Sequence, residues 1–163
     1  MESAKLQTML NEVGALVPRL QAVRADGDGA WTVVFSDDDG RDAAGFVVVN
    51  IEEEQKTVLA ARIGSVVEDR RLATYEFMLQ YNALWRRTGG LKLSLDAERT
   101  LELVVDIPAS TLEPVALSHI LEGFARRILE FQILMSEGGI TTEAERPPVP
   151  DQADLNEMYW QRA

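Results

Sequence analysis

The chain has 163 residues, nearly half of them apolar and a quarter charged, and 27 acidic against 16 basic side chains give it a net charge of −11. This length and balance predict one globular domain, and the negative charge disfavours nucleic acids and anionic membranes, which both need clustered Lys and Arg. The lack of cysteine excludes disulfides, thiolate metal sites and thiol catalysis.

The first 20 residues give no sign of export. The N-terminus carries a glutamate and lacks the basic region and the apolar core of a secretory signal. The longest apolar runs, such as residues 46–49, are far too short to span a bilayer. We therefore expect a cytoplasmic protein without a membrane segment.

The N-terminal part of the chain predicts one helix and a group of strands. Apolar residues recur at every third or fourth position over residues 4–17, which is typical of an amphipathic helix, and Pro18 should end it. A turn cluster at residues 25–30 comes next. Runs rich in β-branched and aromatic residues then predict strands at 31–35, 45–51 and 57–63. Their close succession favours an antiparallel meander.

A second helix is expected from Glu68 to about Thr88. Its apolar residues spread around much of the circumference, so it lies centrally or is covered by a second subunit. Gly89 and Gly90 should end it, because glycine readily adopts the left-handed conformation of a helix C-cap.

The segment GGLKLSLDAERTLELVVDIP, residues 89–108, predicts a β-hairpin with leucines on one face. A helix over residues 112–136 follows, with a heptad-like apolar seam. We expect the leucine face of the hairpin to form the floor beneath this last helix.

The composition changes at the end of that helix. We expect one α+β domain over residues 1–136 and an acidic, proline-containing tail over 137–163. The last residues of the tail, LNEMYW, regain apolar side chains, so this end could dock on the domain or on a neighbour.

No motif for chemistry is present. The chain lacks a glycine-rich phosphate loop and the signatures of hydrolases and metalloproteases, and His119 is its single histidine. We expect no catalytic residue, no metal site and no cofactor. An enzyme that uses dispersed carboxylates would need a deep pocket with converging acidic side chains, and we rank this alternative last.

The segment LQYNALWRRTGGLKLSLD, residues 79–96, resembles the type III secretion chaperone family, the Tir-chaperone-like proteins. The resemblance lies in a helix end with Asn82, a glycine and then LSLD. Leucines and a phenylalanine also fall where the family has them, at Leu103, Leu112, Leu117, Leu121 and Phe124. The YbjN family, whose members are sensory or stress-related proteins, is a close alternative.

The resemblance implies a fold and a function. The fold is α+β, with three helices and an antiparallel sheet of about five strands in the order helix, three strands, helix, two strands, helix. The function is to bind an extended segment of a client protein without ATP, as a homodimer. A YbjN-like protein would instead bind a regulatory partner and have no secretion role. Either partner could use an open sheet edge and its apolar grooves.

The resemblance also implies two sets of site residues. The second helix and its neighbouring strands would form the dimer contact, which gives Tyr75, Leu79, Asn82 and Trp85. The first helix and the sheet would bind the client, which gives Leu6, Leu10, Val33, Phe35 and Val47.

Overall fold

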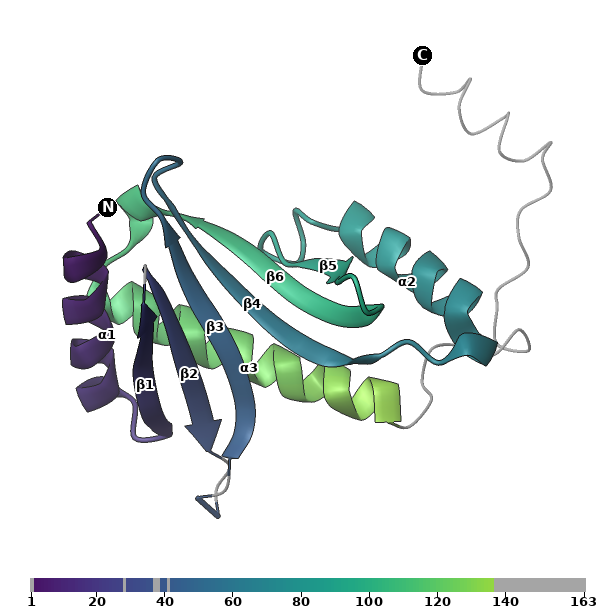
Figure 1. Cartoon of the computed structure of the whole chain (residues 1–163), viewed down its shortest axis with the longest axis horizontal. Helices are drawn as coiled ribbons and strands as arrows, with labels where there is room; N and C mark the ends of the chain where they lie inside the picture. Colours follow the sequence, from purple (N-terminus) through teal and green to yellow (C-terminus); the bar gives the residue numbers. More distant parts are fainter. Residues whose placement is uncertain (1, 28, 37–38, 41, 137–163) are drawn as a thin grey trace.

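The computed structural model describes residues 2–27, 29–36, 39–40 and 42–136, so the expected tail at 137–163 lies outside the described residues. Three α-helices, six strands and two short 3₁₀ helices follow one another in this part of the chain (Figure 1). They are α1 (Ser3–Leu16), β1 (Leu20–Gly27), β2 (Ala30–Ser36), β3 (Asp42–Ile51), β4 (Lys56–Ser65), η1 (Glu68–Arg70), α2 (Arg71–Ala83), β5 (Lys92–Leu95), β6 (Thr100–Pro108), η2 (Ala109–Thr111) and α3 (Pro114–Ser136).

The six strands form one antiparallel sheet in the order β1-β2-β3-β4-β6-β5. Strands β1 to β4 are a meander, and the β5–β6 hairpin joins it through the pairing of β6 with β4. The α+β class, the three helices and the order of the expected elements are thus confirmed. Because the chain passes through α2 between β4 and β5, the hairpin and α2 lie together at one end of the sheet (Figure 1).

The sheet contains one strand more than expected, β1. The sequence LQAVRADG mixes charged with apolar residues and ends in a glycine, so it lacks the strand-like composition of its neighbours. It pairs with β2 through a tight turn, where Gly27 and Gly29 have φ angles of 94° and 77°. Glycine adopts these angles without strain, so the predicted turn cluster is the turn of a hairpin.

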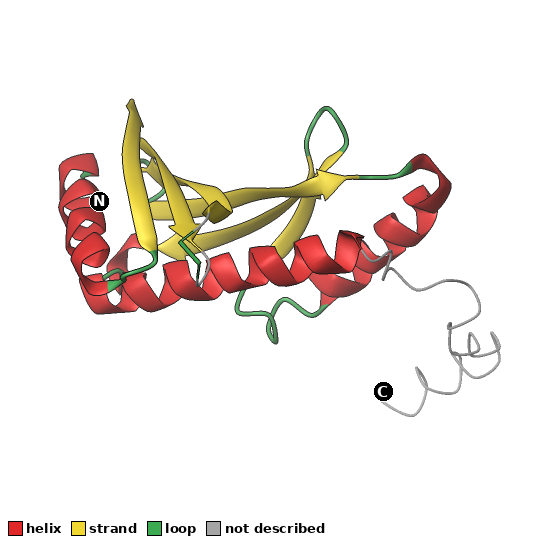
Figure 2. Ribbon diagram, turned by 90° about the horizontal axis from the view of Figure 1, so that it is seen from below, coloured by secondary structure: helices red, strands yellow, loops and turns green. Residues whose placement is uncertain are grey.

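In the described part of the chain, the helices lie on one face of the sheet (Figure 2). Helix α1 packs on β1 and on α3, and α3 runs across β3 and β4. The strands alternate accordingly: β2 directs Trp31, Val33 and Phe35 into the core, and β4 directs Leu59 and Ala61 there. The other face of the sheet has no helix on it among the described residues.

The last helix and the hairpin share one core. Seam residues of α3 are buried, namely Leu117, Leu121, Phe124, Ile128 and Phe131, whereas Met135 is only partly buried. The expected leucine face of the hairpin is also buried, through Leu93, Leu101 and Leu103. The floor beneath α3 consists mainly of β3 and β4, however, because β6 lies beyond β4 in the sheet.

Both ends of the expected second helix differ from the prediction. Residues 68–70 form the 3₁₀ helix η1, and α2 ends at Ala83. Tight turns continue to the two glycines, whose φ angles are 68° at Gly89 and 85° at Gly90. The glycines therefore end the segment in the left-handed conformation that the sequence predicts.

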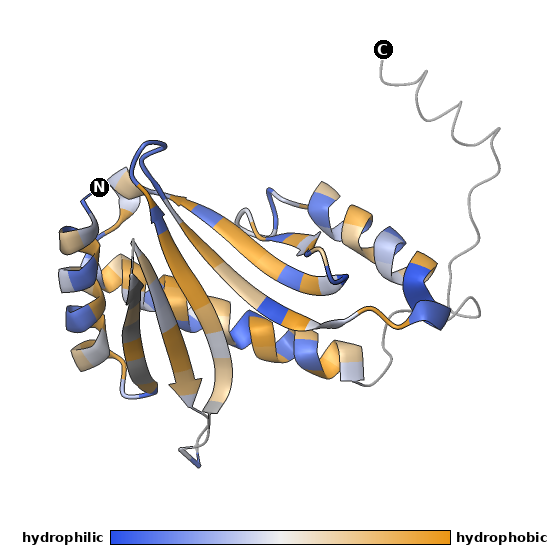
Figure 3. Cartoon of the chain, viewed as in Figure 1, coloured by the Kyte–Doolittle hydropathy of each residue, from blue (hydrophilic) through white to orange (hydrophobic). Residues whose placement is uncertain are grey.

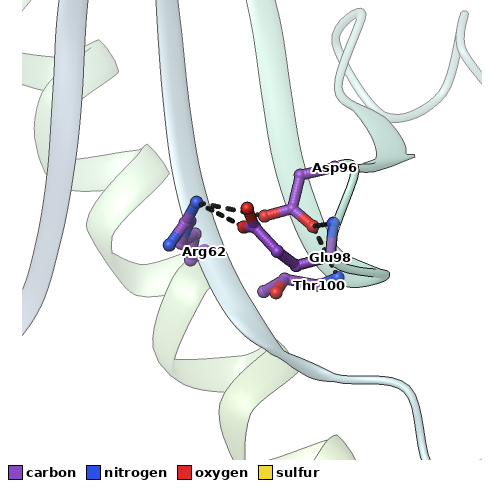
Figure 4. A network of polar contacts seen from close by, with 4 residues as sticks. All are labelled: Arg62, Asp96, Glu98 and Thr100. Carbon is purple, nitrogen blue, oxygen red and sulfur yellow. Dashed lines mark hydrogen bonds and ion pairs between the residues drawn. The ribbon is translucent and has the colours of Figure 1, made fainter.

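The turn of the β5–β6 hairpin is held by one aspartate (Figure 4). Asp96 Oδ1 accepts hydrogen bonds from the backbone N–H groups of Glu98 and Thr100, at 2.9 and 2.8 Å. Its Oδ2 lies 3.1 Å from Nη2 of Arg62 on β4, which also pairs with Glu98 at 3.2 Å. The Thr100 amide, and then the Glu98 amide and Arg62, hold the pKa of Asp96 below its ordinary value.

This arrangement predicts a contribution to stability that disappears in acid. The folded-state pKa of Asp96 is lowered, so the carboxylate stabilises the fold above its unfolded pKa, and this stabilisation is lost as the pH falls through the folded pKa. We expect Asp96→Asn to unfold at lower urea concentration than wild type at pH 7, and the difference to shrink on acidification. Asp69→Asn, an equal charge change at an exposed site, is the control. A difference that persists unchanged in acid would contradict this role.

Candidate partner-binding surfaces

The uncovered face of the sheet carries a contiguous apolar surface, which we call the open face. Its centre lies on three neighbouring strands and consists of Val47, Val49, Val58, Ala60 and Val104. Val47 pairs with Ala60, which pairs with Val104, and Val49 pairs with Val58, so these side chains form two adjacent cross-strand rows. Val47 is 38% exposed, and the others are partly exposed.

Charged side chains border the open face on the side of the hairpin. Arg62 pairs in register with Glu102, and Lys92 lies 3.2 Å from Asp106. The surface thus has an apolar centre and a polar border, as protein-binding surfaces commonly do. Figure 3 shows the apolar colouring that runs along the central strands.

The structure buries most of the residues that the resemblance implies for client binding. Leu6, Leu10 and Val33 are fully buried and Phe35 is 5% exposed, all in the core beneath the helices. Their truncation would open cavities in the core, so it would affect binding only through stability. Val47 alone among the five is exposed, and it lies on the opposite face of the sheet.

A signal for the open face is present in the sequence. In a strand that is buried on one face, apolar and polar residues alternate along the sequence. A strand that is buried on both faces is a continuous apolar run. The run FVVV at residues 46–49 and the run VLAA at 58–61 are continuous. Both lie in central strands with helices on one side only, so their second apolar face remains exposed.

Helix α2 carries a second apolar surface, the α2 stripe, which consists of Leu72, Leu79, Ala83, Leu84 and Trp85. Leu72 is 76% exposed, Leu79 71% and Trp85 53%. Positions 72, 76, 79 and 83 follow the helical repeat, so they lie on one side of α2, where the exposed Glu76 interrupts the apolar residues. The predicted interface residues Leu79 and Trp85 belong to this stripe, and so does Leu72, which was not among the predicted interface residues.

The other two predicted interface residues face the domain. Tyr75 is partly buried against the core. Asn82 donates a hydrogen bond from Nδ2 to the Leu93 carbonyl at 2.9 Å and accepts one at Oδ1 from the Leu93 N–H at 2.8 Å. Because β5 is an edge strand, the carboxamide satisfies backbone groups that face away from β6, and it fastens α2 to the hairpin.

Substitution of Asn82 should therefore destabilise the fold. Asn82→Ala removes both hydrogen bonds and leaves a partly buried amide and carbonyl without them, which costs about 1–3 kcal/mol. Asn82→Asp removes the donor and should cost a similar amount. Urea unfolding measures both, with Gln80→Ala on the exposed side of α2 as the matched control. Equal stabilities of Asn82→Ala and the control would exclude this role.

A shallow pocket of about 270 Å³ lies between α2 and α3, and it is lined by Tyr81, Arg127, Glu130, Phe131 and Leu134. The Tyr81 and Phe131 rings meet edge to face with centroids 5.2 Å apart. Burial raises the pKa of the Tyr81 phenol above its ordinary value, and Arg127 pairs with Glu130. The pocket thus holds a neutral phenol and a compensated ion pair.

The described residues contain no cluster of side chains that could hold a metal ion. Within residues 2–136, apart from the four positions left undescribed, no three His, Asp or Glu side chains converge in a way that could hold a metal ion. His119 is exposed on α3. In the same part of the chain, no helix has the length and apolarity needed to cross a bilayer.

Solved structures share this fold. The chain is similar to the ExsC–ExsE complex, with a TM-score of 0.65 and 18% identity over 81% of this chain and 94% of that chain. It is similar to the HopA1–SchA chaperone–effector complex, with a TM-score of 0.61 and 14% identity over 80% and 94%. It is also similar to the Yersinia pestis type III secretion chaperone SycH in complex with a fragment of YscM2, with a TM-score of 0.55 and 17% identity over 76% and 97%.

The search of curated proteins found no match. The sequence model of the Tir chaperone protein (CesT) family matches residues 20–130, more than half of the chain. This match covers all six strands, α2 and most of α3, and it confirms the resemblance seen in residues 79–96. The chain therefore belongs to the Tir chaperone protein (CesT) family.

Proposed function

We propose that this protein is a secretion chaperone that binds an extended segment of a client protein on the open face of its sheet, without ATP. The observation that carries the proposal is the contiguous apolar centre around Val47, which no helix covers in the described part of the chain. The family match and the chaperone complexes of the same fold support a polypeptide as the ligand. They also favour this function over a YbjN-like regulatory role.

The geometry of the open face suits an extended chain. Its two apolar rows run across the strands, so they present shallow ridges to the alternate side chains of a client segment. The charged side chains of the border, Arg62, Glu102, Lys92 and Asp106, can bond to the client's polar groups. Of the two edge strands, β5 has four residues and is fastened by Asn82, which leaves the eight-residue β1 as the longer edge for added strands.

A charge at the centre of the open face should abolish binding. We expect Val47→Asp to weaken client capture at least about tenfold, because an interface that buries an unpaired carboxylate loses several kcal/mol. Val115→Asp places the same substitution on an exposed valine of α3 and is the control. The measurement is affinity capture from host lysate with quantification of the proteins retained by each variant. Equal retention of every protein by Val47→Asp and the control would refute the assignment to the open face.

We further propose that two copies associate through the α2 stripe. A large apolar area on the surface of a soluble protein commonly marks an interface, and the stripe adjoins β5, whose edge lies beside it. Helix α2 is only about 20 Å long, so the neighbouring hairpin must also contribute to reach the roughly 800 Å² per partner of a stable complex.

This dimer should dissociate when the stripe is charged. We expect Leu79→Glu to sediment as a monomer at micromolar concentrations where the wild type sediments as a dimer. Leu79 is 71% exposed, so the substitution should leave the unfolding midpoint nearly unchanged. Ile133→Glu introduces the same charge at an apolar residue of α3 that is 56% exposed, and it is the matched control. A wild-type monomer throughout this range would contradict the proposal.

A further inference from the structure

The sheet is split between β3 and β4. The pairing of the two strands ends at Val47 and Ala60. Each strand continues beyond this pair, β3 over residues 42–46 and β4 over residues 61–65. Figure 1 shows the two strands diverging from each other, β3 beside β2 and β4 beside β6. We call the inner edges of these two segments the split.

The split leaves backbone groups without ladder partners. Along a strand, alternate residues direct both the N–H and the C=O group to the same side. On their outer sides, residues 42–46 pair with β2 and residues 61–65 pair with β6. On their inner sides, no strand in the described part of the chain pairs with either segment. Each inner edge therefore presents donors and acceptors that an added strand can bind.

Gly45 lies in the β3 edge of the split. It pairs with Val34 and precedes Val47 by two residues, so a side chain at this position would stand on the open face. The residue is exposed, and a Cβ at this position would have no atom within 4 Å. Its φ angle is not positive either. Neither the backbone nor the packing of the single chain therefore requires this glycine, although glycine weakens the interior of a strand. Such a glycine often marks the close approach of a ligand or of another backbone.

We propose that a client strand enters the split and pairs with residues 42–46, with an aromatic side chain over Gly45. An aromatic residue opposite a glycine covers the backbone that the glycine leaves bare. Val34 and Val47 adjoin Gly45 on the same face and provide apolar contacts for the ring. Because this contact rests on the proposed function, it specifies where the client binds and which kind of side chain anchors it.

The split adjoins the apolar centre of the open face. Its last ladder pair, Val47 and Ala60, belongs to that centre, so a client segment that leaves the split continues over the two apolar rows. Strand β1 offers a longer edge, but β2 separates it from β3. A strand that is added to β1 therefore lies farther from this surface. The continuity of the split with the open face favours the split as the place of strand addition.

A phage-displayed library of random peptides of about 12 residues, longer than a typical strand, is the probe. We expect the peptides that the wild type retains to share an aromatic residue within an alternating apolar segment, and to be lost on Val47→Asp. A retained pool without an aromatic preference would overturn the inference. A pool that Val47→Asp retains as well as the wild type would refute the proposed function itself.

Filling the space at Gly45 separates binding from stability. Valine is favoured in strands and would contact Val34 and Val47, so Gly45→Val should raise the urea midpoint of unfolding. The new side chain takes the place of the aromatic ring, so retention of the selected peptides should fall at least about tenfold. Gly45→Ala should give a smaller loss in the same direction. Ala25→Val, at an exposed position of β1, is the control and should bind like the wild type.

Two outcomes of this comparison would count against the contact. Peptides that need Val47 but bind Gly45→Val and Gly45→Ala as tightly as the wild type would refute the contact at Gly45 and leave the proposed function intact. An equal loss in Ala25→Val would mean that the peptides bind at β1, which also contradicts the contact.

Amide hydrogen exchange locates the added strand directly. With a synthetic copy of a retained peptide, alternate amides in residues 42–46 should exchange at least about tenfold more slowly, because they gain hydrogen bonds. The amides of Leu20–Gly27, in β1, should exchange as in the free protein. Protection along β1 without protection of residues 42–46 would place the peptide on the outer edge and overturn the inference.

Discussion

The burial of one face of the sheet beneath α1 and α3 is the constraint on which the other features depend. It fixes the alternation of every strand, because residues such as Val33 and Leu59 must lie under the helices. The central strands β3 and β4 are apolar on both faces, however, and the described helices cover one of these faces. The fold therefore completes its core on one face of the sheet and leaves Val47 and its neighbours accessible on the other. A second polypeptide can cover this surface.

Helix α2 is attached to the domain on its inner side alone. It attaches to the domain through specific contacts at its inner side, namely the bidentate bonding of Asn82 to Leu93 and the contacts of Phe77 and Tyr81 with Phe131. Its outer side contributes nothing to the core, and Leu72 and Leu79 remain in solvent. A helix that is held on one side and apolar on the other is stable in the single chain and still available for association.

The two surfaces differ in chemistry. The open face has an apolar centre with neighbouring charges of both signs, of which Lys92 and Asp106 form an ion pair across β5 and β6. The α2 stripe instead ends beside two exposed arginines, Arg86 and Arg87. Such a difference in charge would favour different partners at the two proposed surfaces, because like charges across an interface disfavour the wrong partner. A chaperone that keeps client binding and self-association on separate elements can regulate one without blocking the other.

The sequence by itself determined the elements and the family. The period of the apolar residues predicted the three helices and the hairpin, and β-branched and aromatic composition predicted three further strands, which gives five of the six. The glycines at 89 and 90 ended a helical segment as expected, and the order of elements pointed to the secretion chaperones. It did not identify β1, whose mixed composition becomes a strand only by pairing with β2. It also could not decide which face of each strand is covered, since both faces of β3 are apolar and the choice depends on where α1 and α3 pack. That choice buried Leu6, Leu10, Val33 and Phe35 and exposed Val47. Likewise Asn82 faced β5 rather than a partner, because the edge of a sheet exists only once the strands have assembled.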